Sequence, residues 1–493
     1  MDFDFSFGRP SGGEPRDEAP FRLLVLGNFS GHGGLPLAQR VPVAVDIDSI
    51  DQVLARFAPR LALDLGDATV ALAFSEIEDF HPDAIYERVD LFAGLRGLRQ
   101  ELRDPALFAR AAAALGAAPT GTGAVDGDAA ADETGGDIER LLGRKPSGPA
   151  MPAGHQEAAA QGIDALIRNV VAPHVVHDNP QQQQVMAAAD DAIADHMRRV
   201  LHHPEFQALE ALWRSVERMV RELDCGETLE LYLMDYSRQD LLADVSAHAD
   251  NMAASTIQRL LCGREGAGAE GRRWSVVALD QAFGPDAAEM ALLTLLSAMA
   301  AKSGSALLAG ARPALLGCDS VQALASAAEW PAADEAAFSA WNALRASGVA
   351  ASVGLALPGV LVRLPYGKAT DPVSAFAFEE MAAGRDHGRY LWGPPALALA
   401  TLCGQAFQQE GWAMDPDDVL DLEDLPSHVY REDGEAGQQP CAEILMSEPA
   451  GNAALARGVM PLLSYRNRNA ARLMRWQSIG IGGVPIAGPW QSG

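Results

Sequence analysis

Residues 353–372 read VGLALPGVLVRLPYGKATDP, and the rest of the chain can be interpreted outward from this stretch. Residues 353–357 form a continuous apolar run, which is typical of a strand covered on both faces. Pro358 and Gly359 interrupt the run, and residues 360–364 then resume as a strand of alternating polarity. The stretch therefore predicts a buried core strand that leads into a second strand.

A charged loop follows these strands. Pro365, Tyr366, Gly367 and Lys368 are typical of a turn, in which Gly367 is free to adopt a positive φ. One interpretation is a site for an anion or a partner at Arg363 and Lys368, because loops on a rigid core often carry function. The other is a structural turn with a solvated lysine and an ion-paired arginine. The residues alone leave both interpretations open.

The composition narrows the class of protein. With 493 residues the chain is long enough for two or three domains, and 48% hydrophobic and 21% charged residues fit a globular protein. Its formal net charge of −28 would repel nucleic-acid phosphates and anionic membranes. We therefore expect no nucleic acid and no membrane as a main partner, and the acidity favours solubility or docking to basic protein surfaces.

The cysteines and the N-terminal sequence favour a cytoplasmic protein. The five cysteines are dispersed without a CxxC pair, as expected for reduced thiols. The N-terminal residues are acidic and lack a basic region followed by an apolar run, so they do not resemble a signal peptide. The longest apolar windows, near residues 290–301 and 394–403, are too short to span a bilayer. We therefore predict a cytoplasmic location without membrane insertion.

A longer pattern continues on both sides of the opening stretch. HHPEFQALEALWR (202–214) precedes it, and FAFEE (376–380) and YLWG (390–393) follow it. This order resembles the large subunit of the contractile sheath of type VI secretion systems. Gly359 stands where that family usually has Arg, and Ala369 where it often has Asp or Glu. The resemblance covers residues 163–412 and, more loosely, the rest of the chain.

The N-terminal part carries a second pattern. Its marks are FRLLVLGNFSG (21–31), VDID (45–48), DFHPD (79–83) and LFAGLRGLR (91–99). They resemble the small subunit of the same sheath, with Asn28 in place of the usual Asp. Residues 109–162 are rich in Ala, Gly, Pro, Thr and Asp, which is typical of a flexible linker. We therefore predict an N-terminal arm (1–20), a small-subunit-like domain (21–108), a linker (109–162) and a large-subunit-like domain (163–493).

Apolar periodicity predicts alternating strands and helices along the chain. Strands are expected at residues 21–27, 61–65, 70–74, 229–234, 274–279, 306–309, 441–446 and 459–463, and helices at 49–57, 80–102, 162–171, 182–200, 208–223, 286–303 and 453–457. This rhythm indicates a sheet with helices on both faces. The predicted fold class is α/β (α+β mixed), with sheath-type domains of mixed sheets flanked by helices, plus an extended terminal arm.

The predicted arm begins with an aromatic pattern. Residues 2–7 alternate Asp or Ser with Phe3, Phe5 and Phe7, which predicts a short strand with one aromatic face. An isolated strand is unstable, and residues 8–20 form a Gly- and Pro-containing tether. Subunits of the family that the chain resembles link by such arms. One interpretation is strand exchange with a neighbouring subunit, and the other is a frayed terminus.

Sequence motifs for catalysis or cofactor binding are missing. Histidines gather between residues 174 and 203, but no HExxH or CxxC motif supplies converging metal ligands. The sequence has no GxSxG nucleophile elbow, and Ala369 follows Lys368 where a phosphate loop has Ser or Thr. We therefore expect no enzyme, no catalytic residue, no metal and no cofactor.

The resemblance implies a structural function. The chain would polymerise with itself into a helical sheath around an inner tube protein, with baseplate proteins as further partners, and contract to propel the tube. The candidate interface residues are Phe3, Phe5, Phe7, Arg363, Tyr366 and Lys368.

The resemblance also implies an AAA+ unfoldase as a partner, which disassembles contracted sheaths by binding an N-terminal helix of the large subunit. Here that helix would lie within residues 137–171, behind a fused domain and interrupted by Pro146, Pro149 and Pro152, which argues against recognition. Two alternatives to the sheath remain open. One is a non-polymerising accessory or baseplate-associated binding protein, and the other is an enzyme with an anion site at the Arg363–Lys368 loop.

Overall fold

The computed structural model describes residues 19–66, 68–104, 107–108, 110–111, 182–262, 273–330, 338–382, 384–432 and 434–491. They form two compact units. The first, called here the sheet unit, comprises the described residues of 19–81, 200–373 and 378–491, and the second, the helical unit, those of 82–199 and 374–377. The arm residues Phe3, Phe5 and Phe7, the unfoldase segment 137–171 and most of the predicted linker lie outside the described residues.

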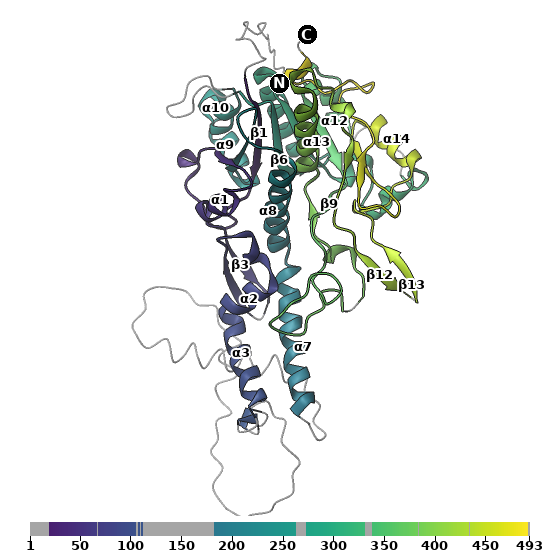
Figure 1. Ribbon diagram of the computed structural model, residues 1–493. Helices are drawn as coiled ribbons and strands as arrows, with labels where there is room; N and C mark the ends of the chain where they lie inside the picture. The colour runs from purple at the N-terminus through teal and green to yellow at the C-terminus, as the bar shows by residue number, and fades with distance from the viewer. Residues whose placement is uncertain are drawn as a thin grey trace, which may run out of the picture. The chain divides into compact units, whose positions relative to one another are not determined.

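The sheet unit contains a nine-stranded mixed sheet in the order β11-β15-β14-β8-β7-β6-β1-β5-β2, of which Figure 1 labels the central strands β1 and β6. Its strands are β1 (Phe21–Gly27), β2 (Val43–Val45), β5 (Leu229–Asp235), β6 (Val276–Phe283), β7 (Ala306–Ala311), β8 (Val353–Leu357), β11 (Asp421–Leu422), β14 (Met460–Ser464) and β15 (Ala471–Leu473). Neighbouring strands from β14 to β5 pair in parallel, whereas β2, β15 and β11 pair antiparallel at the two edges. A parallel centre of this kind is covered by helices on both faces.

Strand β1 belongs to the N-terminal pattern and lies in the middle of this sheet. It pairs in parallel with β5 on one side and with β6 on the other, where Leu23 lies opposite Val276. Leu23, Leu24 and Val25 have 0% exposed surface. A strand buried on both faces requires a continuous apolar sequence, which FRLLVLG supplies. The small-subunit-like strand therefore shares one hydrophobic core with the large-subunit-like strands.

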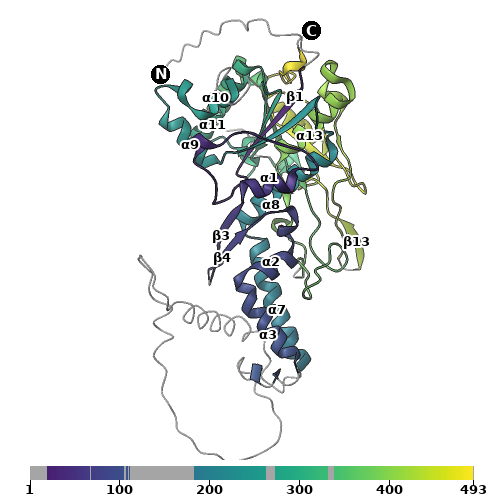
Figure 2. The same cartoon turned by 60° about the vertical axis from the view of Figure 1, so that its left-hand side comes forward.

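Helices pack on the two faces of the sheet according to the alternation of the strand side chains (Figure 2). One face packs against α9 (Arg238–Ala247), α10 (Thr256–Cys262), α11 (Ala287–Ser303), α12 (Ser339–Arg345) and α14 (Glu448–Ala456). The other face packs against α8 (Pro204–Glu222) and α13 (Pro395–Glu410). A Cβ at Gly27 would lie 2.8 Å from Leu212 of α8, and one at Gly404 of α13 would lie 2.8 Å from Leu223. Both glycines therefore permit close packing on this face.

Smaller elements complete the sheet unit. They are α1 (Ile50–Phe57) and three pairs of strands: β3 (Arg60–Asp64) with β4 (Thr69–Ala73), β9 (Val360–Leu361) with β10 (Trp392–Gly393), and β12 (Val429–Glu432) with β13 (Glu435–Gln438). Phe74 stacks on Phe80 with ring centroids 4.2 Å apart, and Phe206 of α8 lies within 6.1 Å of both. This aromatic group joins the N-terminal residues to α8.

The helical unit contains α2 (Pro82–Arg88), α3 (Asp90–Arg103) and α7 (Gln182–Leu201), of which α7 belongs to this unit up to Arg199. Arg99 of α3 pairs with Asp190 of α7 at 2.6 Å and donates to the Ala375 carbonyl at 2.7 Å. The Tyr86 ring lies 4.8 Å from that of Phe376. These contacts hold α3, α7 and the short segment 374–377 together.

The sequence predicted the mixed α/β fold correctly, and two of its strands wrongly. The predicted strand at 360–364 ends at Leu361, because the chain turns there and buries Arg363. The predicted strand at 441–446 is a loop, in which only Ala442 bridges to Val360. Helix α13 was not predicted, since residues 396–404 are buried all round and show no polar face, and its exposed polar residues gather only in the last turns. Among the described helices, none has both the length and the hydropathy needed to cross a membrane.

Candidate functional site

The loop after β9 is braced by hydrogen bonds of its own backbone. Gly367 N donates to Asp371 O at 2.8 Å, and Lys368 N donates to the Glu379 carboxylate at 3.0 Å. Gly367 does not adopt the positive φ that a glycine is free to take. A Cβ at Gly367 would collide with the Glu379 carboxylate, so a larger residue would displace this exposed side chain from its bond with Lys368 N. The turn is therefore fixed by its contact with the segment that follows it.

Arg363 lies in the interior, and its side chain is only 9% exposed. Its Nε donates to Glu210 Oε1 at 2.8 Å and its Nη1 to Glu380 Oε2 at 2.9 Å, and both glutamates have 0% exposed surface. The guanidinium also lies over the Tyr366 ring, with Cζ 4.2 Å from the ring centroid. We call these four residues the buried cluster. They match the interpretation of an ion-paired arginine, and a role of Arg363 and Tyr366 at a subunit interface stays a prediction.

The charges of the buried cluster offset one another, although Glu210 Oε2 is buried without a hydrogen-bond partner among the described residues. Burial alone would lower the pKa of Arg363 and raise that of Glu380. The carboxylates around Arg363 outweigh this and hold its pKa well above the usual value, and the Arg363 charge holds the pKa of Glu380 below its usual value. Tyr366 N donates to Glu380 Oε2 at 2.8 Å, and His202 Nε2 lies 3.2 Å from Glu380 Oε1. Arg214 approaches from α8, and its Nη2 donates to the Tyr366 hydroxyl at 3.3 Å. The cluster is suited to fixing the loop against α8.

Lys368 has a different environment from Arg363 and Tyr366. Tyr366 is 1% exposed, whereas Lys368 is exposed on the outside of the same braced turn. Within the described part of the chain, the Lys368 ammonium has no ion pair. The structure therefore separates the three loop residues that the sequence grouped together, with two inside and one outside.

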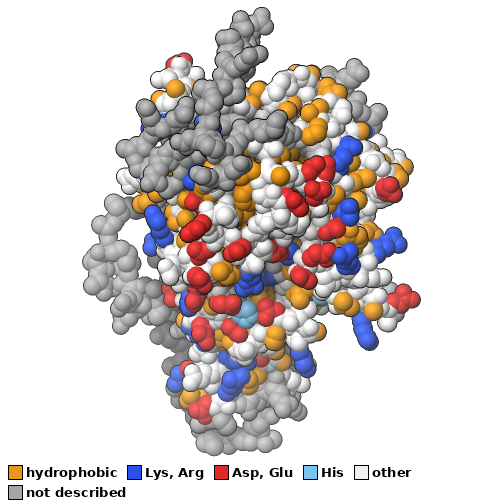
Figure 3. All heavy atoms as spheres, turned by 45° about the horizontal axis from the view of Figure 1, so that its top comes forward, with side chains coloured by type: hydrophobic (Ala, Val, Ile, Leu, Met, Phe, Trp, Pro, Cys, Tyr) orange, Lys and Arg blue, Asp and Glu red, His pale blue; other side chains and the backbone are white. Residues whose placement is uncertain are grey.

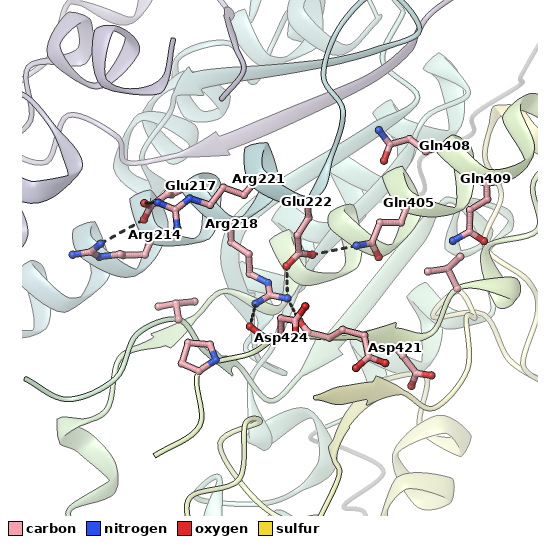
Figure 4. Close-up of a pocket in the computed structure, with 14 residues that line it drawn as sticks. Arg214, Glu217, Arg218, Arg221, Glu222, Gln405, Gln408, Gln409, Asp421 and Asp424 are labelled. Atoms are coloured by element: carbon pink, nitrogen blue, oxygen red, sulfur yellow. Dashed lines mark hydrogen bonds and ion pairs between the residues drawn. The ribbon is translucent and has the colours of Figure 1, made fainter. Parts of the chain in front are cut away.

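A groove of about 700 Å³ lies between α8, α13 and the loop 419–426 (Figure 4). Its charged and amide lining consists of Arg214, Glu217, Arg218, Arg221, Glu222, Gln405, Gln408, Gln409, Asp421, Glu423 and Asp424. The α8 residues lie three and four positions apart, so they share one face of the helix. Sequence reasoning missed this groove, although the RSVERMVRE spacing of α8 (214–222) was a usable signal.

Arg218 is the central cation of the groove. It pairs with Glu222 and also donates to the backbone carbonyls of Glu423 and Asp424. Gln405 Nε2 donates to the second carboxylate oxygen of Glu222 at 3.2 Å. Burial lowers the pKa of Arg218 and raises that of Glu222, and their mutual attraction offsets this only in part. Glu222 therefore remains able to gain from a further nearby cation.

The other acidic residues of the groove differ in their partners. Asp421 pairs with Arg472, and Glu423 with Arg468. Asp424 is exposed and adopts a left-handed backbone with φ of 53°, a conformation that Asp tolerates better than most residues. Its carboxylate has no ion pair or hydrogen bond with any residue that the structure describes.

The chemistry of these two regions is that of charged contacts. Within the described ranges, no group of three or more His, Cys, Asp and Glu side chains is placed to hold a metal ion. Burial raises the pKa of the Cys441 thiol to about 11, which disfavours the nucleophilic thiolate. Figure 3 shows acidic side chains interspersed with Lys and Arg over one face of the molecule. Such a surface can pair with protein groups of either charge.

Comparison with known proteins identifies the two sequence patterns. The family described as EvpB/VC_A0108, tail sheath N-terminal domain, matches residues 183–480, and the family described as Type VI secretion system, VipA, VC_A0107 or Hcp2, matches residues 9–110. The type VI secretion system sheath protein TssC1 of Pseudomonas aeruginosa is 27% identical over 303 residues, which cover 60% of this chain and 61% of TssC1. The sheath protein TssB1 of the same organism is 27% identical over 101 residues, which cover 18% of this chain and 59% of TssB1. The chain thus spans about three fifths of the length of these relatives.

These matches define a tail sheath protein of the type VI secretion class. The chain belongs to the VipB family of sheath proteins, whose match covers more than half of its length, and its N-terminal part matches the VipA family. Both sheath subunit types are therefore fused in one polypeptide, as the sequence predicted. This family is one of structural proteins and is not a known enzyme family.

Proposed function

We propose that this chain is a cytoplasmic structural subunit that polymerises into a type VI secretion sheath around an inner tube and contracts to propel that tube. The observation that carries the proposal is the position of β1, a strand of the small-subunit pattern that lies between β5 and β6 of the large-subunit pattern. TssB1 and TssC1 are separate proteins, whereas here one chain supplies both parts of a single core. Each chain would then be a complete repeating unit of the sheath.

Contraction of this kind requires no active site. The work would come from the free-energy difference between extended and contracted packing, released over many bistable interfaces. A subunit that transmits such strain must itself stay rigid, because packed cores deform little. The buried sheet and the ion-paired cluster around Arg363 support this role, since they fix the loop to α8.

In this proposal the predicted linker 109–162 has a physical role between the predicted segments 21–108 and 163–493. The linker replaces the encounter of two chains by an intramolecular one, which raises the effective concentration of β1 at its place in the sheet. The boundaries of the compact units differ from these segments, since residues 19–81 fold with the sheet unit. The linker would therefore connect parts of one folded subunit and not two independent modules.

The N-terminal arm is the proposed link between subunits. Burying each of Phe3, Phe5 and Phe7 on a neighbouring sheet edge would contribute roughly 1.5–3 kcal/mol. An inner tube protein and baseplate proteins are the further proposed partners, and recognition by an AAA+ unfoldase is not part of the proposal.

Two alternative functions, a non-polymerising accessory protein and an enzyme, would use the arm and the Arg363–Lys368 loop differently. A non-polymerising accessory or baseplate-associated protein would use the same fold without the arm contacts. An enzyme with an anion site at Arg363 and Lys368 has less support, because two buried carboxylates already bind the Arg363 guanidinium.

Electron microscopy and sedimentation of the purified full chain test the proposal, with a variant lacking residues 1–10 beside it. The full chain should form tubes, and the truncated chain should remain monodisperse with an unchanged midpoint of thermal unfolding. A monodisperse full chain would instead favour the accessory function. Tubes from the truncated chain would leave the sheath proposal intact and remove the arm as its link.

A further inference from the structure

The backbone that carries the unpaired cation of the loop is held in a fixed position. Lys368 lies on a turn that is closed by the bond from Gly367 N to Asp371 O and tied to Glu379 through its own backbone N–H. Beneath it, Tyr366 N donates to the buried carboxylate of Glu380. A backbone braced in this way loses little conformational entropy on binding, so the entropy cost is mainly that of the Lys368 side chain. The sequence contains only three lysines, so such an exposed ammonium is a rare group on this acidic chain.

The unpaired carboxylate of the groove is held in a similar way. Arg218 donates to the carbonyl oxygens of Glu423 and Asp424, and Leu425 N donates to Asn469 O at 2.8 Å. The backbone of Asp424 is therefore fixed on both sides, and its carboxylate is exposed at the groove. Glu222 lies close enough to Asp424 for the Asp424 charge to raise its pKa further. Of these two carboxylates, Glu222 pairs with the Arg218 guanidinium and Asp424 does not, so a second cation beside them would be stabilised.

We propose that Lys368 of one copy of this chain docks into the α8–α13 groove of a second copy and pairs there with Asp424. This inference rests on the proposed sheath function, and it names a contact between neighbouring subunits. Among the described residues these two groups are opposite in charge, exposed and unpaired, so the pairing breaks no existing bond. The ion pair Arg218–Glu222 beside it stays intact and lines the pocket that receives the lysine.

The geometry of such a contact has a consequence for assembly. The turn and the groove are different surfaces, so the contact is heterologous, and each copy offers one of each. A heterologous contact that does not close into a ring generates an open helical polymer, whereas a self-complementary contact would stop at a dimer. The contact should also weaken with salt, because both charges are exposed before docking and are screened at high ionic strength.

A double-mutant cycle on the full chain tests the pairing. Lys368→Met removes the ammonium, and Asp424→Asn removes the carboxylate while keeping a residue that tolerates positive φ. Each substitution should raise the concentration needed for assembly about 30-fold, as for loss of one partner of a desolvated charge pair, and the double variant should be no worse than either single one. Lys302→Met is the control, because Lys302 is an exposed lysine at the end of α11 and should have no effect. The proposal would be overturned if either single variant assembled normally. It would also be overturned if the increase in assembly concentration in the double variant equalled the product of the two single increases.

A cross-linking experiment separates this proposal from the proposed function. One tagged chain carries Ala369→Cys, at the exposed position next to Lys368, a differently tagged chain carries Gln409→Cys in the groove, and each is also mixed with unsubstituted chain as a control. Oxidation of the first mixture should produce a disulfide-linked pair that contains both tags, and the controls should not. If the unsubstituted chain forms tubes but the mixture of the two cysteine variants gives no cross-link, the docking is refuted and the sheath proposal stands. The cross-link in a chain that forms no tubes would support the docking and count against the sheath.

Discussion

The buried cluster around Arg363 and the groove along α8 are built from the same kinds of side chain, and Arg214, which lines the groove, also donates to Tyr366 of the cluster. In the cluster, Glu210 and Glu380 have 0% exposed surface and contact Arg363 directly. In the groove, Arg221 is 64% exposed and pairs with Glu217 at 2.5 Å. Position relative to solvent is therefore the main difference between the two.

That difference determines what each region can do. In the interior an unpaired charge costs several kcal/mol, so every member of the cluster must keep its partner and none is available for binding. At the surface, water and salt screen each pair, so groups such as Asp424 can remain unpaired at little cost. The buried cluster thus provides rigidity and the groove provides recognition, although both use the same types of side chain. Substitutions should therefore change the free energy of unfolding by graded amounts.

The largest effect is expected in the buried cluster. Glu380→Ala leaves the Arg363 guanidinium without one of its two carboxylates in a site of low dielectric, and should lower the free energy of unfolding by about 3–5 kcal/mol. Urea denaturation followed by circular dichroism measures this change.

The matched control replaces the whole ion group by apolar residues, as Arg363→Met, Glu210→Leu and Glu380→Leu together. Most of the stability should return, since no charge is then left buried without a partner. A triple variant as unstable as Glu380→Ala would show that lost packing, and not the unpaired charge, causes the effect.

An intermediate effect is expected at Asp280, a carboxylate on β6 beside Gly27 that has no partner among the described residues. Burial raises its pKa from 3.8 to about 7, so the folded state binds its proton more tightly than the unfolded state does. The stabilisation is complete below about pH 4 and is lost as the pH rises toward 7. Asp280→Asn should therefore stabilise the chain at about pH 8 by up to a few kcal/mol, relative to its effect at about pH 4. Equal effects of the substitution at both pH values would contradict this assignment.

The smallest effect is expected in the groove. Arg221→Ala removes an exposed member of the Glu217 pair and should cost about 0.2–1 kcal/mol, less at high salt. Urea denaturation at low and high salt gives both values, with Arg221→Lys as a variant that keeps the charge. A loss above about 2 kcal/mol would mean that the groove is as well desolvated as the cluster, and would remove the contrast between them.

The sequence predicted the elements whose pattern is local. The apolar runs at 21–27 and 353–357 correspond to the buried strands β1 and β8, and the run at 286–303 corresponds to α11. The motifs also sufficed to recognise both sheath subunit types in one chain, because they extend over tens of residues. Helix α13 has no such local pattern, because a helix that is buried nearly all round has no amphipathic period, and the sequence therefore did not predict it.

The sequence by itself determined the fold class, the two family patterns and the acidic, charged nature of the surface. Only the tertiary structure placed β1 between β5 and β6, and separated buried Arg363 from exposed Lys368 on one loop. It also formed the groove by bringing α8 against α13 and residues 419–426, which lie about two hundred positions further along the chain. The physical reason is that strand order, burial and ion pairing are decided by contacts between distant residues. A local pattern fixes what a segment can become, and its neighbours in space decide which of its charges remain free.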